Sequence, residues 1–384
     1  MCICKKSSTF AALSIYEMNH MKELTKTLLV QVKKRDVAQP GSATVWGTGG
    51  RKFKSCHPDK IRATRAFTTA LFLAQFIIYY MRLQGKYEHS HVMIKTLQWL
   101  GCTLLFSMFA AGTIFLFEQP LSVNALKWIQ FAQSAAMFLL PPLCMAYLWS
   151  QEPMKWLKVD KFQSFKVSVC AVLLMLVALP AINLLAYTNE QMSLPTFLEP
   201  LEVWMKTQEE TAKHLTEQFM NTTTFNGLII NILLMALLPA VAEELTFRGV
   251  LQRLFQGSKV SDSPTAKAPH LAIWCTAILF SAIHMQFYGF VPRMLMGALF
   301  GYMLTWTGSL WVPILMHFTN NAMAVILYFV AQCADWDMEK VDTIGTSDTL
   351  WLGIVSMVMT IIGIYAFRRS TTMSNASSRM SSGN

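Results

Sequence analysis

The sequence predicts an all-α, polytopic membrane protein built as a bundle of about eight transmembrane helices. Hydrophobic residues make up 53% of the chain and charged residues only 14%, against about 25% charged in soluble domains. The mean hydropathy is +0.37. Apolar runs of about 20 residues, the length that crosses a bilayer, follow one another along most of the chain. The net charge of +10 lies largely in the N-terminal stretch and in short loops, which indicates a cytoplasmic membrane face and no nucleic-acid partner.

Eight runs are predicted to cross the lipid bilayer. The sixth is short and the fourth carries charge, so these two have the least certain bounds. In chain order the predicted spans are Gln98–Phe117, Lys127–Trp149, Lys166–Tyr187, Asn226–Leu251, Leu271–Phe290, Pro292–Trp306, Leu310–Val330 and Leu350–Phe367.

Loop charges alternate along the chain and predict the orientation of these spans. Basic loops belong on the cytoplasmic side. The predicted cytoplasmic set is Lys155, Lys158, Lys161, Arg253, Lys259, Lys267, Arg368 and Arg369, and the predicted outer set is Glu190, Glu199, Glu202, Glu209, Glu210, Glu217, Asp335, Asp337, Glu339, Asp342 and Asp348. Eight spans with both termini in the cytoplasm satisfy every assignment.

Three regions follow from this reading. Residues 1–92 form a predicted poorly ordered, basic extension, and residues 37–58 resemble the conceptual translation of a transfer-RNA gene. The natural start is therefore expected downstream, at Met93 or Met81; the alternative is a real, disordered basic extension. Residues 93–370 form the predicted membrane domain, with its motifs within 226–330. Residues 371–384 form a predicted polar, disordered tail.

Two packing features are also expected. In the acidic loop from Pro200 to Met220, apolar residues recur at helical spacing. This predicts a helix that either lies flat on the membrane surface or packs over the protein's own outer loops. Gly297 and Gly301 form a GxxxG pattern on the sixth span, which permits close approach of another helix.

The fourth span carries two adjacent carboxylates and an arginine inside an apolar helix. Ionisable groups near the bilayer centre cost several kcal/mol unless they are paired. Glu244 and Arg248 are four residues apart and can pair on one helix face. Glu243 is turned by about 100° from Glu244, so one carboxylate remains available to face a cavity. Pro239, one turn earlier, is expected to kink the helix.

Two further spans bring polar groups to membrane depth. Phe280 and His284 share a face of the fifth span, and His317 and Asn321 share a face of the seventh. Such groups normally turn toward a bundle interior or a water-filled cavity. Together they supply a base, two imidazoles and an amide, which suits activation of a water and stabilisation of an oxyanion. Taken singly, each also fits a helix–helix contact.

These three ordered motifs, Glu243-Glu244-x-x-x-Arg248, Phe280-x-x-x-His284 and His317-x-x-x-Asn321, resemble those of the type II CAAX prenyl endopeptidase family, also called CPBP or Abi. The resemblance covers roughly residues 226–330. It implies an all-helical intramembrane endopeptidase that acts on a membrane-associated peptide or protein, either of CAAX type or in bacteriocin and peptide processing.

The resemblance also implies a role for each motif residue. Glu243 would be the general base that activates water, with His284 helping. His317 and Asn321 would stabilise the oxyanion or position the water. Glu244, Arg248 and Phe280 would support the site.

The glutamate mechanism requires no metal, and no HExxH motif occurs in the sequence. We therefore expect no cofactor. The alternative is a zinc site with two histidines and one carboxylate, formed by Glu243, His284 and His317.

Two other functions remain open at this stage. Intramembrane carboxylates and histidines also suit an ion-coupled transporter, although the two halves of the chain show no repeat of the kind that transporters carry. A catalytically silent immunity or scaffold protein could bind a peptide in the same cavity.

Overall fold

The computed structural model describes residues 83–117, 121–257, 270–336 and 344–382. The chain divides into two units, Met1–Ala70 and Leu71–Asn384, and all described residues belong to the second. Most of the predicted basic extension, and the loop that holds Lys259 and Lys267, lie outside the described residues. Every regular element in the described part is helical, so the predicted all-α fold is correct.

Seven helical stretches of the described residues are long and apolar enough to cross a membrane. The chain is therefore an integral membrane protein with a polytopic helical bundle. The stretches are Val92–Leu116 (α3 Val92–Gly112 and η1), Val123–Trp149 (α4 Val123–Ser134, η2 Ala135–Leu139, α5 Leu140–Trp149), Phe165–Glu190 (α7), Phe225–Gln256 (α9 to α11), Phe287–Thr307 (η7 and α13 Phe290–Thr307), Trp311–Cys333 (α14) and Ser347–Thr371 (η8 and most of α16 Leu350–Ser382).

The fifth predicted span is shorter than expected, and its bounds of Leu271–Phe290 are wrong. Helix α12 covers His270–Ile283, and its 14 residues fall short of the roughly 20 that a bilayer requires. Met285 takes a left-handed conformation with φ of 55°, which prevents the helix from continuing beyond the turn at His284. The apolar residues Phe287 and Phe290 continue the hydrophobic run past this break, so hydropathy alone does not reveal it.

The irregular backbone after α12 is held by polar side chains. Asn189, at the end of α7, donates from Nδ2 to the Phe287 carbonyl (3.1 Å) and accepts at Oδ1 from the Val291 N–H (2.9 Å). The Ser281 hydroxyl donates to the Phe290 carbonyl at 2.7 Å. Because non-helical backbone inside a membrane protein must find partners within the protein, these bonds permit the short segment 284–289 to interrupt the helices.

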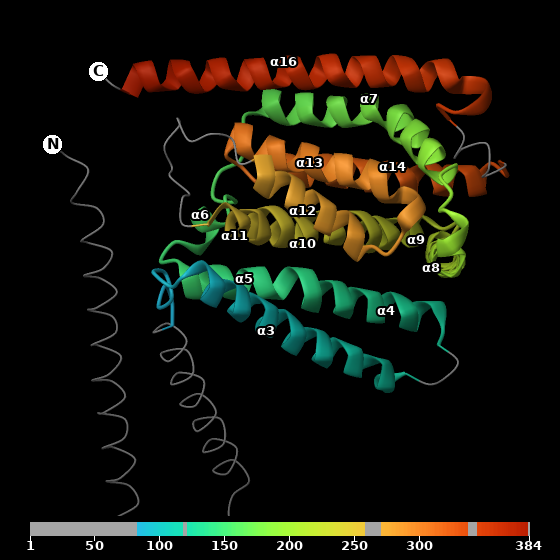
Figure 1. Cartoon of the computed structure of the whole chain (residues 1–384), viewed down its shortest axis with the longest axis horizontal. Coiled ribbons are helices and arrows are strands. Elements are labelled where there is room, and N and C mark those ends of the chain that lie inside the picture. The colour runs from blue at the N-terminus through green and yellow to red at the C-terminus, as the bar shows by residue number, and fades with distance from the viewer. Residues whose placement is uncertain (1–82, 118–120, 258–269, 337–343, 383–384) are drawn as a thin grey trace, which may run out of the picture. The chain divides into compact units, whose positions relative to one another are not determined.

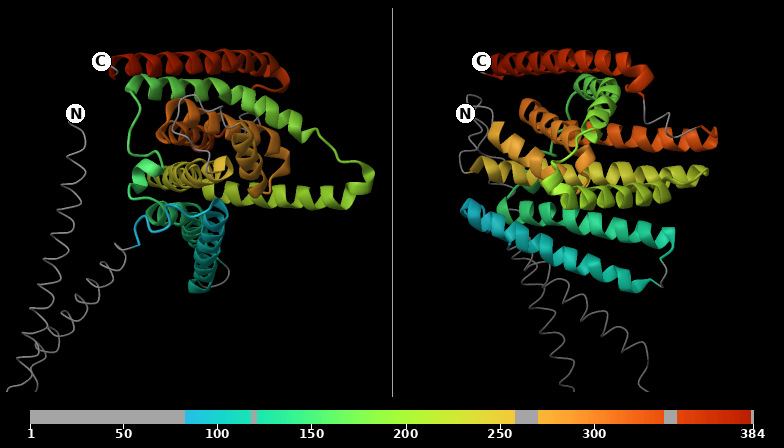
Figure 2. Two further views of the ribbon diagram at one scale, coloured as in Figure 1. Left: turned by 60° about the vertical axis from the view of Figure 1, so that its left-hand side comes forward. Right: turned by 45° about the vertical axis from the view of Figure 1, so that its right-hand side comes forward.

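The contacts between the spans show which helices form the interior of the bundle. Helix α14 contacts α7, α10 (Leu238–Glu244) and α13, while α12 packs on α13. Helix α16 covers α7 on one side of the bundle, and α3 packs on η2 and α5 on the other (Figures 1 and 2). Helices α10, α12 and α14, which carry the three sequence motifs, therefore meet in the interior of the bundle.

The fourth span changes its winding on both sides of α10. It consists of α9 (Phe225–Asn231), the π-helical turn η4 (Ile232–Leu237), α10, a second π-helical turn η5 (Leu245–Leu251) and α11 (Gln252–Gln256). Pro239 is the second residue of α10, two residues after the end of the first π turn, and its missing N–H removes one helical hydrogen bond. The Glu243–Glu244 pair thus lies between two wide turns, a helical irregularity that is common at functional sites.

Helix α8 (Glu199–Met220) forms where the sequence predicts a surface helix. It runs across the ends of the spans and is seen nearly end-on in Figure 1. It contacts the short turn η7 (Phe287–Gly289) and the helices α14, α4 and α9, so it packs against the protein itself. Its Trp204 ring lies 5.6 Å from the Phe287 ring, and Leu201, Val203 and Leu215 stay exposed.

The two glycines of the GxxxG pattern allow close helix contact, as predicted. A methyl group at Gly301 would lie 2.9 Å from Ile273 Cγ2, and one at Gly297 would lie 3.3 Å from the Ala277 Cα. Both contacts are made with α12. The Gly297 position also touches the Arg248 guanidinium at 3.2 Å, so this close approach is part of the surroundings of the buried arginine.

We expect Gly297→Leu to lower the stability of the folded protein by about 1–3 kcal/mol, because extra carbons in a filled interior force neighbouring atoms apart. Thermal unfolding of the purified protein in detergent measures the change. Gly101→Leu on α3 is the control, since a Cβ at Gly101 has no heavy atom within 4 Å. Equal losses in both variants would contradict close packing at Gly297.

Candidate active site

Glu244 and Arg248 form the buried ion pair that their spacing predicts. Arg248 Nη1 lies 2.7 Å from Glu244 Oε1, and both side chains are fully buried. Arg248 Nη2 also donates to the Gly297 carbonyl at 3.0 Å. The guanidinium lies 4.5 Å from the Phe280 ring centre and 5.3 Å from that of Phe300. The arginine charge is thus enclosed by a carboxylate, a carbonyl and two aromatic faces.

The same carboxylate orients His317. Glu244 Oε1 lies 3.0 Å from His317 Nδ1. Because the carboxylate accepts, Nδ1 carries the hydrogen and donates it. The other ring nitrogen, Nε2, faces Glu243 at 3.9 Å. Glu244 therefore connects Arg248 to His317, a contact that the sequence spacing within one helix does not reveal.

His284 is oriented in a parallel way by a backbone group. Its Nδ1 lies 2.7 Å from the Phe280 carbonyl, which can only accept, so Nδ1 donates here too. Its Nε2 lies 3.8 Å from Glu243 Oε2. The buried Phe280 ring packs against both imidazoles, with centres 5.0 Å from His284 and 6.0 Å from His317. Phe280 thus contacts both of the histidines that face Glu243.

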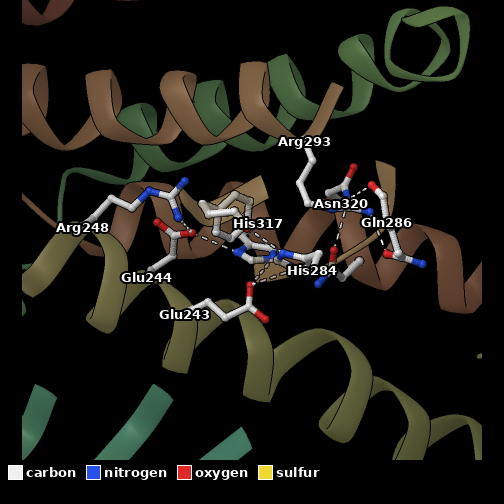
Figure 3. A network of polar contacts seen from close by, with 10 residues as sticks. Glu243, Glu244, Arg248, His284, Gln286, Arg293, His317 and Asn320 are labelled. Carbon is white, nitrogen blue, oxygen red and sulfur yellow. Dashed lines mark hydrogen bonds and ion pairs between the residues drawn. The ribbon is translucent and has the colours of Figure 1, made fainter. Parts of the chain in front are cut away.

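Glu243 is the carboxylate that both imidazoles approach, and it lies beside the two rings in Figure 3. Its Oε2 atom is buried and has no hydrogen-bond partner among the described residues. The distances of 3.8 and 3.9 Å to the two imidazole nitrogens are too long for direct hydrogen bonds. Three polar atoms from α10, α14 and the end of α12 thus surround one small space.

That space is part of a cavity of about 370 Å³, within the range of roughly 300–1,000 Å³ typical of small-ligand sites. Asn320 and Asn321 line it, and the Asn320 Nδ2 donates to Asn321 Oδ1 at 3.1 Å. This bond leaves the Asn321 Nδ2 as a further donor. The full lining is Thr216, Met220, Met235, Pro239, Glu243, Phe280, His284, Gln286, Arg293, Met296, Phe300, His317, Asn320, Asn321, Ala324 and Val325.

The structure therefore brings together all four residues singled out for chemistry, Glu243, His284, His317 and Asn321. Further residues, not predicted from the sequence, lie at the same site. Arg293 and Gln286 line the same cavity, and Thr216 and Met220 bring the end of α8 to it. Arg293 carried a usable signal, because a cation in an apolar span is itself a mark of function. No signal in the sequence indicated that Thr216 and Met220 of α8 reach the cavity, because their position depends on tertiary contacts.

The residues that would hold a zinc ion have part of the chemistry that such a site needs. In His284 and His317 the Nδ1 hydrogen is donated to a carbonyl or a carboxylate, as in many metal-binding histidines. The Nε2 atom of each ring faces Glu243. Among the described residues, no group of three His, Cys, Asp or Glu side chains is arranged as a metal site.

Comparison with known proteins finds similarity in the part of the chain that contains the site. Residues 225–323 match the family model described as type II CAAX prenyl endopeptidase Rce1-like. A stretch of 99 residues is 32% identical to the "Uncharacterized protein YpbD" of Bacillus subtilis (strain 168), and it covers 25% of this chain and 44% of that protein. No solved structure matches the chain. The matched residues include α10, α12 and the part of α14 that bears His317 and Asn321.

We expect Arg248→Met to destabilise the protein by about 3–5 kcal/mol, because it leaves the Glu244 carboxylate buried without its ion-pair partner. The midpoint of thermal unfolding in detergent reports the change. A double variant, Glu244→Gln with Arg248→Met, removes the uncompensated charge and should recover part of the loss. An unchanged midpoint for Arg248→Met alone would show that the ion pair does not support the fold.

Proposed function

We propose that this chain, whose residues 225–323 match the Rce1-like family model, is an intramembrane endopeptidase that cuts a membrane-associated peptide or protein by water attack. One observation carries the proposal: the unpartnered Glu243 Oε2 lies 3.8 and 3.9 Å from the Nε2 atoms of two imidazoles at the wall of a buried cavity. Polar atoms at such separations are suited to share one water.

In this mechanism Glu243 acts as the general base. It takes a proton from the water as the water oxygen attacks the carbonyl carbon of the scissile peptide bond. The second hydrogen of the water goes to Nε2 of His284, which can only accept because its Nδ1 hydrogen is held by the Phe280 carbonyl. His317, whose Nδ1 hydrogen is held by the Glu244 carboxylate, lines the other part of the same space. Protonated Glu243 then gives the proton to the leaving nitrogen as the carbon–nitrogen bond breaks.

Asn321 supplies the donor for the developing oxyanion. Its Oδ1 accepts from Asn320, which leaves the Nδ2 hydrogens for the carbonyl oxygen of the substrate. A fixed neutral donor of this kind stabilises the tetrahedral intermediate without a change in its own protonation. Asn320 thus acts through Asn321, as a positioning residue.

The proposed reaction needs no metal ion, because a carboxylate base and an amide donor already provide for the water and the oxyanion. If a metal is bound, Glu243, His284 and His317 are the side chains that would hold it. Treatment with a chelator distinguishes a metal-free reaction, which continues, from a metal-dependent one, which stops.

The expected result for the site is a loss of cleavage without a loss of folding. Glu243→Gln and His284→Ala should each abolish detectable cleavage of a peptide library presented in lipid vesicles, and Asn321→Ala should lower the rate by about 10²–10³-fold. Mass spectrometry of the products, with and without chelator, reads out activity, cut position and metal dependence together. Glu199→Gln, on an exposed carboxylate of α8, is the control. Normal cleavage by the Glu243→Gln and His284→Ala variants would refute the proposed mechanism.

The proposal includes the orientation of the chain, with both termini in the cytoplasm, and it counts α12 together with the segment 284–289 as the eighth crossing beside the seven long stretches. The basic loop of Lys155, Lys158 and Lys161 precedes α7, whereas the acidic α8 follows it. A span between a basic and an acidic loop places the basic one inside. Since the end of α8 lines the cavity, a substrate that enters beside α8 comes from the non-cytoplasmic side.

Single cysteines in an otherwise cysteine-free background test this orientation. Asp160→Cys and Gln191→Cys lie just outside the two ends of α7, and both positions are exposed. A maleimide that cannot cross membranes should label the second but not the first in intact cells, and both after lysis. Labelling of only Asp160→Cys in intact cells would reverse the assignment.

A further inference from the structure

Two arginines lie close to the proposed active site, and their surroundings differ. In Figure 3, Arg248 and Arg293 are on opposite sides of the two imidazoles. Arg248 is fully buried and neutralised by Glu244. Arg293, the fourth residue of α13, is partly exposed and lines the cavity together with Glu243, His284, His317 and Asn321.

Neutral acceptors hold the Arg293 guanidinium. Nη2 donates to Gln286 Oε1 at 2.8 Å, and Nη1 donates to the Gln286 carbonyl at 3.2 Å. In the described part of the chain, no carboxylate forms an ion pair with it. Its nearest acidic neighbours, Glu209 and Glu243, act on it only at longer range. A guanidinium carries five N–H donors, so Gln286 fixes its position and leaves both charge and donors for another partner.

Helix α8 does not supply a carboxylate that forms an ion pair with Arg293. Glu209 of α8 is engaged elsewhere, because its Oε2 accepts from the Tyr288 N–H at 3.4 Å. Burial raises the pKa of Glu209 above its ordinary value, while the Tyr288 N–H and the positive charge of Arg293 act in the opposite direction. The Glu209 carboxylate thus attaches α8 to the 287–289 turn, and the Arg293 guanidinium remains accessible from the cavity.

We propose that Arg293 is a specificity-determining residue that binds a carboxylate of the substrate while the scissile bond lies at Glu243. The planar guanidinium fork matches a carboxylate and favours it over neutral groups. The carboxylate is either the C-terminal one of the peptide or that of an acidic side chain near the cut. This inference rests on the proposed peptidase function, and it adds that the enzyme selects anionic peptide segments.

The chemistry agrees with the charges in the cavity. Glu243 repels a second carboxylate, so an anionic segment needs a cation to enter the same space. Arg293 provides it on the side of Gln286 and the end of α8, away from the Glu244–Arg248 pair (Figure 3). Binding energy gained there positions the peptide carbonyl for attack, which is the use that enzymes make of remote substrate contacts.

The test uses one peptide library prepared in two forms, as C-terminal free acids and as C-terminal amides, with glutamate or glutamine at each internal position. Full-length wild-type protein in lipid vesicles should show a kcat/KM at least tenfold higher for peptides that carry the recognised carboxylate. The Arg293→Gln variant should lose this preference, mainly through a higher KM. The acid–amide comparison and the Glu–Gln comparison identify the source of the carboxylate.

Two further variants guard against a simple loss of folding. Gln286→Glu keeps Arg293 in place but gives it an internal carboxylate, so the preference should fall by a similar factor. Arg293→Lys retains the charge without the fork and should keep part of the preference. Lys206→Gln, on an exposed lysine that pairs with Glu202 on α8, is the matched control and should change nothing.

The failure of each proposal has a distinct signature. Wild-type cleavage that depends on Glu243 but treats acids, amides, Glu and Gln peptides alike would overturn the role of Arg293 and leave the peptidase proposal intact. If no peptide is cut, the peptidase proposal fails. Binding of the free-acid and amide peptides to the Glu243→Gln variant, followed by thermal shift, then still tests Arg293: equal shifts with both forms and with both Glu and Gln peptides would overturn carboxylate recognition.

Discussion

The arrangement of the site depends on the buried pair of Glu244 and Arg248. A carboxylate and a guanidinium inside a membrane bundle are tolerated only when each satisfies the other. The Glu244 carboxylate also has a second contact, because the same Oε1 that pairs with Arg248 accepts a hydrogen bond from His317 Nδ1. The ion pair thereby links α10 to α14 and sets which nitrogen of His317 faces the cavity.

The second constraint is the room needed for this pair and for the cavity beside it. Helix α13 meets α12 through Gly297 and Gly301, and the Gly297 carbonyl accepts from Arg248. Helix α12 ends at Ile283, which places His284 at its end and allows the irregular segment 284–289 to contribute Gln286 to the cavity. Backbone of this kind is stable at membrane depth because Asn189 and Ser281 satisfy it.

The two arginines near the site show how burial and pairing separate structural from recognition roles. Arg248 is fully buried and paired with Glu244, so its charge is neutralised within the protein. Arg293 is held in place by the neutral side chain of Gln286 and lines the cavity. The same residue type near one site is thus suited to different roles by the charge of its immediate partner, and the substrate preference proposed above follows from this difference.

Much of the fold and the site could be predicted from the sequence, because the bilayer imposes strong rules on composition. Apolar runs located the spans, and the cost of buried charge drew attention to Glu243, Glu244, Arg248, His284 and His317. Spacing of four residues predicted the Glu244–Arg248 pair, since both groups lie on one helix face. The end of α12 escaped prediction, because the apolar residues beyond Ile283 continue the hydropathy signal through a backbone break.

Only the tertiary structure decided how the helices combine. The distances of about 4 Å between Glu243 and the two imidazoles, the bond from His317 to Glu244, and the approach of α8 and Arg293 to the cavity all join residues far apart in the chain. Helical periodicity defines which side chains share a face of one helix, but it carries no information on which faces meet. That choice is made by side-chain packing and by the pairing of polar groups across the whole bundle.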